Sequence, residues 1–211
     1  MNENIISILK TLTVDFFTAF GLYSFLFLIS SIFIKKATFY KFDEEAKKFI
    51  SFVGFLYIII WFLGIFVYYI ESSPEERTGI INRMFGKYWF GIWIQPLFWF
   101  LLSQIFRIKL FSKNILIRIF ASFFLIFSIE RLVIISTSLH RDYLPSSWTI
   151  YSDLGIYSSF FILSILLKIL FFMLFVWLFT FILNKINQLR NNKLLFPIWK
   201  NLPRIQDIKK N

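Results

Sequence analysis

Long apolar stretches separated by short charged segments set the pattern of this chain. Segments 16–34, 49–70 and 88–106 carry no charge, 119–137 contains one adjacent charged pair, and 154–184 contains one lysine. A helix needs about 20 apolar residues to cross a membrane, and continuous runs without alternation are not those of a β-barrel. We therefore predict an all-α integral membrane protein, a five-transmembrane-helix bundle. Its spans would lie at about 13–34, 49–70, 88–106, 115–137 and 156–184, with residues 1–184 as the membrane domain and 185–211 as a basic cytoplasmic tail.

The distribution of Lys and Arg predicts how the bundle is oriented. Sixteen of them fall in segments 35–48, 107–118 and 185–211, and five fall on the opposite side of the predicted spans. Positively charged loops remain in the cytoplasm. The N-terminus is therefore expected outside and the C-terminus in the cytoplasm, with loops 71–87 and 138–153 facing outward.

Composition excludes several classes of function. The chain is 58% apolar and carries a net charge of +11, but its basic residues sit in short clusters between apolar runs, so we expect a lipid bilayer and no nucleic acid as partner. The absence of cysteine excludes thiolate metal sites and thiol catalysis within this chain. The single histidine, His140, cannot supply both ligands of a bis-histidine haem. We expect no bound metal, no cofactor held by this chain and no catalytic residue.

Three charged residues fall inside the apolar segments 119–137 and 154–184: Glu130, Arg131 and Lys168. Such groups are costly in lipid and are candidate functional residues. Glu130 and Lys168 lie at similar depths on antiparallel neighbouring helices, so we predict that they form an ion pair. Two interpretations stay open, a proton or quinol site and an interhelical clamp that neutralises both charges.

Two segments carry a family resemblance. Residues 130–148 read ERLVIISTSLHRDYLPSSW, and residues 81–93 read INRMFGKYWFGIW. Both resemble the polysulfide-reductase NrfD family of membrane subunits, most closely the quinone-binding subunit of alternative complex III. The similarity extends over approximately residues 12–184 and corresponds to the last five of about ten family spans. The matching residues are His140, Arg141, Asp142, Pro145 and Trp148 in the outer loop, and Asn82, Arg83, Phe85, Gly86, Tyr88 and Trp89 in the second motif.

The resemblance implies a half-length membrane subunit of a quinol-oxidising respiratory complex in the bacterial inner membrane, not catalytic alone. Implied partners are a periplasmic iron–sulfur protein docked on the outer loop, cytochrome subunits, and other membrane subunits including an N-terminal NrfD half. The family's quinone pocket is attributed mainly to that missing half, so a quinone would bind only at the level of the complex. Lys87 replaces a family proline, and Leu63 stands near a family glutamate. A degenerate or repurposed structural membrane subunit without an electron-transfer role is the alternative.

Overall fold

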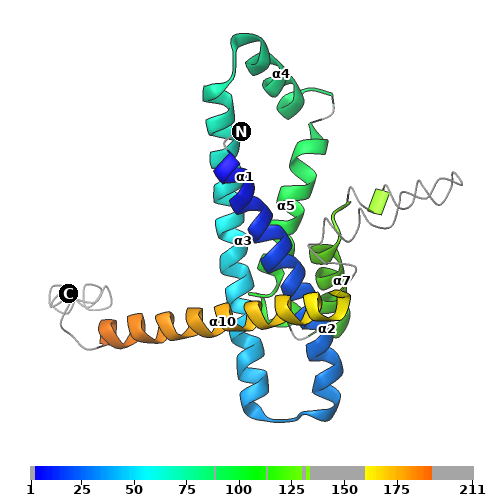
Figure 1. Cartoon of the computed structure of the whole chain (residues 1–211), viewed down its shortest axis with the longest axis vertical. Helices are drawn as coiled ribbons and strands as arrows, with labels where there is room; N and C mark the ends of the chain where they lie inside the picture. Colours follow the sequence, from blue (N-terminus) through cyan, green and yellow to red (C-terminus); the bar gives the residue numbers. More distant parts are fainter. Residues whose placement is uncertain (1–2, 88, 113, 130–131, 134–159, 192–211) are drawn as a thin grey trace, which may run out of the picture. The chain divides into compact units, whose positions relative to one another are not determined.

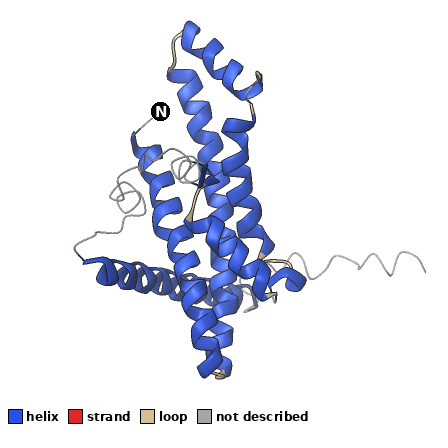
Figure 2. Ribbon diagram, turned by 90° about the vertical axis from the view of Figure 1, so that its right-hand side faces the viewer, coloured by secondary structure: helices blue, strands red, loops and turns tan. Residues whose placement is uncertain are grey.

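The computed structural model describes residues 3–87, 89–112, 114–129, 132–133 and 160–191, and this part of the chain is helical without strands (Figures 1 and 2). Its first helical stretch is continuous and consists of α1, the π-helix η1 and α2. The elements are α1 (Glu3–Lys10), η1 (Thr11–Phe17), α2 (Thr18–Phe33), α3 (Ala37–Glu71), α4 (Pro74–Phe85), α5 (Phe90–Ile105), α6 (Lys109–Ser112), α7 (Ile115–Ile126) and α10 (Phe161–Asn191).

The chain divides into two compact units, Met1–Met173 and Leu174–Asn211. The described part of the second unit is the C-terminal portion of α10, with exposed side chains such as Trp177 and Phe181. Every contact discussed below lies within the first unit.

Three helical segments are long and apolar enough to cross a membrane: Glu3–Phe33, Ala37–Glu71 and Ile162–Leu189. Helices α5 and α7 are apolar but shorter. The predicted all-helical, multi-pass membrane character is thus confirmed at this level. The helices do not begin where the predicted spans begin, because the first starts at Glu3 and residues 37–48, predicted as extramembrane, are the first third of α3. Helix α7 ends at Ile126, inside the predicted span 115–137.

Glycines allow two helix pairs to approach closely. A Cβ on Gly21 of α2 would lie 2.8 Å from the backbone oxygen of Ser122 in α7. A Cβ on Gly54 of α3 would overlap Ser103 Oγ in α5. Small residues at such contacts let helix backbones pack tightly in lipid, where no hydrophobic force drives helices together.

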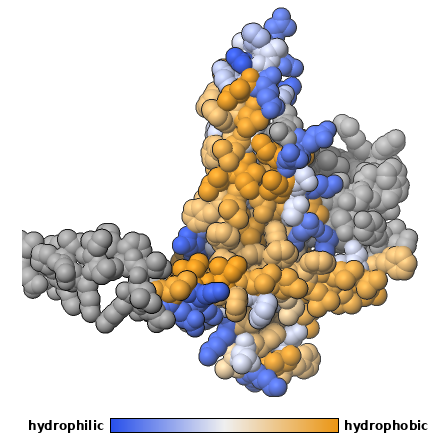
Figure 3. All heavy atoms as spheres, turned by 60° about the vertical axis from the view of Figure 1, so that its left-hand side comes forward, coloured by the Kyte–Doolittle hydropathy of each residue, from blue (hydrophilic) through white to orange (hydrophobic). Residues whose placement is uncertain are grey.

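Aromatic rings fill the interior where α2, α3 and the first part of α10 meet. The fully buried Phe20 packs edge-on against Phe106 and Phe172, with ring centroids 4.9 and 5.8 Å apart. The ring of Phe49 in α3 lies 5.7 Å from that of Phe172, so the Phe172 ring links α10 to both α2 and α3. The outer surface is also apolar over much of the helices in Figure 3. Such a surface suits contact with lipid rather than water.

Candidate functional site

A buried charge network joins α2, α3 and α7. It consists of Asp43, Lys47, Arg118, Tyr23 and Ser24. Arg118 Nη1 and Nη2 donate to the two carboxylate oxygens of Asp43 at 2.8 and 2.6 Å. Lys47 Nζ lies 3.0 Å from Asp43 Oδ2, and the Tyr23 hydroxyl donates to Oδ1 at 3.4 Å. The side chains of Asp43 and Arg118 are 4% and 5% exposed, so this pair is enclosed by protein.

The arrangement of this network favours a structural role. Both oxygens of Asp43 accept charge-assisted bonds, which are about twice as strong as neutral ones. The Arg118 guanidinium also lies 4.3 Å from the centroid of the Phe27 ring and 3.4 Å from Ser24 Oγ. Because its acceptor positions are occupied, Asp43 acts as a fixed anion rather than as a base. The network carries a net charge of +1, and Arg118 Nε is buried without a partner.

A second ion pair links the π-helix η1 to α10. Lys168 Nζ lies 2.8 Å from Asp15 Oδ1 and 3.4 Å from the Val14 carbonyl oxygen. The Lys168 side chain is 12% exposed, whereas that of Asp15 is 54% exposed. π-Helical turns are rare and often occur at functional positions. The partner of Lys168 in the structure is thus Asp15, which the sequence pattern did not identify.

The predicted partner of Lys168, Glu130, lies outside the described residues, as does Arg131. The Glu130–Lys168 pair stays a prediction. His140, Arg141, Asp142, Pro145 and Trp148 also lie outside the described part, and so does Tyr88.

The segment between α3 and α5, predicted as an outer loop, contains a helix with a well-defined start. Ser73 precedes α4, and its backbone N–H donates to Glu76 Oε2 at 2.9 Å, while Glu76 N–H donates to Ser73 Oγ at 3.4 Å. This reciprocal capping box is completed by Pro74 at the first helical position. The Ser73 backbone and hydroxyl bonds lower the pKa of the Glu76 carboxyl.

Two side chains fix α4 to the helices on either side. Arg77 Nε and Nη2 donate to the carbonyl oxygens of Tyr69 and Ile70 at 3.0 and 2.9 Å, which satisfies groups left unpaired at the end of α3. Trp93 Nε1 in α5 donates to the Met84 carbonyl oxygen at 2.9 Å. We call residues 68–93, which include both connections, the α4 corner.

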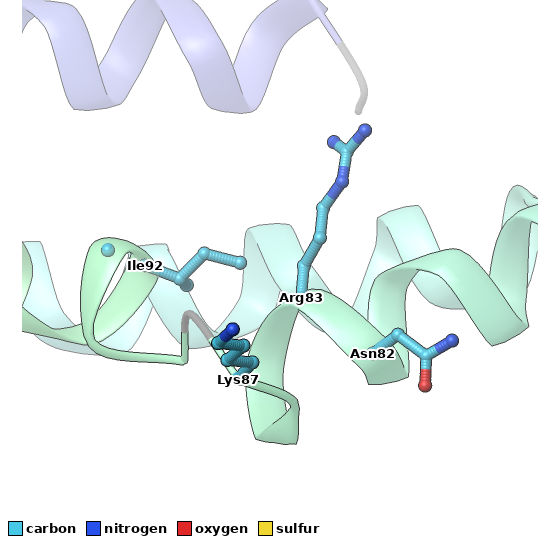
Figure 4. A pocket seen from close by; sticks show the side chains of 5 residues that line it. Asn82, Arg83, Lys87 and Ile92 are labelled. Atoms are coloured by element: carbon cyan, nitrogen blue, oxygen red, sulfur yellow. The ribbon is translucent and has the colours of Figure 1, made fainter.

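An open pocket of about 230 Å³ lies in the α4 corner, lined by Asn82, Arg83, Lys87, Gly91 and Ile92 (Figure 4). In Figure 4 the Lys87 side chain lies between Arg83 and Ile92. Two residues of the second family-like motif, Asn82 and Arg83, thus line this pocket.

Three other residues of that motif shape the corner without lining the pocket. Gly86 follows the end of α4, and its N–H donates to the Asn82 carbonyl oxygen at 2.8 Å. Phe85 and Trp89 are 72% and 54% exposed. The motif therefore combines polar pocket residues with exposed aromatic rings.

Further polar contacts tie α5 to its neighbours. Ser51 Oγ of α3 donates to the Ser103 carbonyl oxygen at 2.8 Å, and Trp99 Nε1 donates to that of Phe124 at 2.8 Å. Where α7 ends, Gln95 Oε1 accepts from the Ile129 N–H at 2.8 Å. A side-chain amide thus satisfies backbone that is freed by the break in the helix.

Within the described residues, no group of three or more His, Cys, Asp or Glu side chains could hold a metal ion. Comparison with protein families, with curated proteins and with solved structures finds no match to this chain.

Proposed function

We propose that this chain is a membrane subunit of a quinol-oxidising respiratory electron-transfer complex, an NrfD-like half-length protein of the bacterial inner membrane. It would anchor and dock a periplasmic iron–sulfur subunit and contact cytochrome and other membrane subunits, including an N-terminal NrfD half. The support is the similarity of residues 130–148 and 81–93 to that family's signature segments. In this proposal the chain holds no redox centre, and a quinone binds only at the level of the complex.

The structural observation that carries the docking role is the construction of the α4 corner. A connector between two spans requires only a short turn, whereas this segment is capped by Ser73 and Glu76 and fixed by Arg77 and Trp93. It lies on the side where the lysine and arginine distribution predicts the outside of the membrane. A rigid, partly charged surface there suits a protein partner, because pre-organised surfaces lose less entropy on binding.

The proposal includes five spans with the N-terminus outside. Helix α5, with 16 residues, rises about 24 Å, which covers most of a hydrocarbon core of about 30 Å. Helix α7 rises about 18 Å over 12 residues, and the helical backbone at Ile129 would continue this span beyond the break.

Affinity purification from native membranes tests the proposal. The tagged chain is extracted in mild detergent, and co-purifying proteins are identified by mass spectrometry and a haem stain. We expect an iron–sulfur subunit and a cytochrome, and Arg141→Ala should weaken retention of the extracytoplasmic partner. Lys48→Ala is the matched control, because that lysine is exposed on the predicted opposite side. Recovery of the chain without any redox subunit would contradict the proposal.

The alternative is a structural membrane subunit without an electron-transfer role. It is favoured by the two ion pairs Asp43–Arg118 and Asp15–Lys168, which join helices in the manner of clamps. Quinol-dependent reduction of an artificial acceptor by the purified complex separates the two roles. Partner retention without any quinol-dependent reduction would favour the structural role.

A further inference from the structure

We propose that a small monovalent anion such as chloride binds between α2 and α7, held by one edge of the Arg118 guanidinium and by the hydroxyls of Ser24 and Ser122. The site lies beside the Asp43–Arg118 pair, where the two helices run side by side (Figure 1). This inference does not depend on the electron-transfer role, because it concerns how the charge network between these helices is completed.

The network contains more positive than negative charge. Within the described residues, Asp43 is the one carboxylate that contacts Arg118 or Lys47, at 2.6 and 3.0 Å. One anion therefore faces two cations. The Arg118 side chain is 5% exposed, so water screens the excess charge little. Buried charges in proteins are paired, since an unpaired charge away from water is costly. The network is thus one negative charge short.

The Arg118 guanidinium has one edge left over. Asp43 takes the end of the guanidinium, where Nη1 and Nη2 each donate to one carboxylate oxygen. The adjacent edge is formed by Nε and by the second N–H of Nη2. Nε is buried without a partner, and besides Asp43 Nη2 contacts only Ser24 Oγ, at 3.4 Å. Two parallel donors on one edge of an arginine form a fork that suits an anion.

Two buried serine hydroxyls add donors to this edge. Ser24 lies at the edge itself, and its Oγ accepts from Arg118 while its own O–H donates to no residue that the structure describes. Ser122 follows Arg118 by one turn on the same face of α7, and its Oγ is buried without a partner. Buried polar groups are nearly always hydrogen-bonded, and an exception calls for an explanation such as a bound water or ion.

An anion explains these observations better than a water molecule does. Either could accept hydrogen bonds from Nε and from the two hydroxyls. Water is neutral, however, and leaves the excess positive charge in place, whereas a monovalent anion makes the network neutral. The packing one turn away indicates its size, because a Cβ on Gly21 would lie 2.8 Å from the backbone oxygen of Ser122. Helices this close favour a single-atom anion over a phosphate or a carboxylate.

Thermal unfolding of the detergent-purified full chain tests for the anion. Tm is compared in sodium chloride, sodium bromide and sodium gluconate at equal ionic strength, so that surface charges are screened equally. A ligand at about 100 times its Kd should raise Tm by about 5–11 °C, and we expect a saturable rise of this order in chloride and bromide over gluconate. Equal Tm in the three salts would overturn the proposal, because an empty or water-filled site does not respond to a halide.

Serine variants locate the site. Ser122→Ala removes one donor and keeps every charge of the network, so it should weaken chloride binding, measured from the dependence of Tm on chloride concentration, about tenfold. Ser103→Ala is the matched control, because Ser103 is an equally buried serine of α5 outside the network. It should leave the chloride dependence unchanged even if it lowers Tm. The same chloride dependence in Ser122→Ala as in the unaltered chain would refute the site.

A change of charge gives an independent test. Arg118→Met removes both the donor edge and the excess positive charge, and leaves Asp43 paired with Lys47. The chloride dependence of Tm should therefore disappear in this variant, whatever its Tm in gluconate. A chloride dependence that persists in Arg118→Met would show that the halide acts elsewhere on the chain, and it would overturn the proposal.

Discussion

Removing either member of the Asp43–Arg118 pair should destabilise the bundle, but by unequal amounts. The network holds one carboxylate and two cations, because Lys47 lies 3.0 Å from Asp43 Oδ2. Asp43→Asn leaves Arg118 and Lys47 facing each other without an anion. Arg118→Met keeps much of the side-chain volume beside Phe27 and leaves a neutral Asp43–Lys47 pair. Asp43→Asn should therefore be the more damaging of the two changes.

The structure sets the expected magnitudes. As whole residues, Asp43 and Arg118 are only 3% and 4% exposed, so solvent screens their interaction little. Leaving an uncompensated charge after removal of one partner from a buried pair costs about 3–5 kcal/mol. Arg118→Met loses bonds to a charged group that is still paired, which costs about 1.5–3 kcal/mol. At about 2–4 °C per kcal/mol, Asp43→Asn should lower Tm by about 6–20 °C and Arg118→Met by about 3–12 °C.

Thermal unfolding in detergent, followed by tryptophan fluorescence, tests this order. The double variant Asp43→Asn/Arg118→Met should melt above Asp43→Asn alone, because the remaining Lys47 can extend toward water. Glu45→Gln is the control, since it breaks an exposed pair with Lys48 that is worth about 0–1 kcal/mol. Equal melting temperatures for the two single variants, or additive losses in the double variant, would refute the reasoning.

Three further predictions follow from the same contacts. A C-terminal GFP fusion should fluoresce and a C-terminal alkaline phosphatase fusion should be inactive in a bacterial host, and the reverse result would overturn the predicted orientation. Gly54→Leu should lower Tm strongly by forcing α3 away from α5, whereas Gly79→Leu, in open space, should change it little. In double-mutant cycles read out by Tm, Lys168→Met should couple to Asp15→Asn; coupling to Glu130→Gln alone would mean that Lys168 pairs as the sequence predicted.

Apolar runs were sufficient to predict an all-helical membrane protein, because helix formation in lipid requires little beyond a long uncharged segment. They were not sufficient to place the polar residues. Asp43 and Arg118 stand 75 positions apart in the sequence, and they fall in segments 35–48 and 107–118, whose positive charge predicts a cytoplasmic position. A charged residue is normally excluded from a predicted span. A partner of opposite charge on another helix allows such a residue to be buried between helices. Nothing in a single sequence identifies that partner.

Helix α4 is predictable from the sequence. Ser73, Pro74 and Glu76 spell a capping box with proline at the first helical position. Apolar residues then follow at helical spacing. The charge of this segment and its resemblance to a family motif predict a loop instead. Its hydrophobic pattern is short, and it becomes informative only when it is combined with the capping signal.

Polar contacts, rather than the abundant aromatic residues, decide which helices of this bundle pair. Lipid tails are as apolar as phenylalanine or leucine, so burying a ring against another helix gains little over leaving it in lipid. Several helix pairs nevertheless share a polar connection. The connections are Asp43–Arg118 between α3 and α7, Ser51–Ser103 between α3 and α5, Trp99–Phe124 between α5 and α7, and Asp15–Lys168 between η1 and α10. Because a polar group without a hydrogen-bond partner is costly in lipid, each connection fixes which two helices pair and the register between them. Replacing one phenylalanine on the lipid-facing surface with leucine should therefore leave the pairing of the helices intact. Breaking one polar connection should instead loosen the contact between the two helices that it joins.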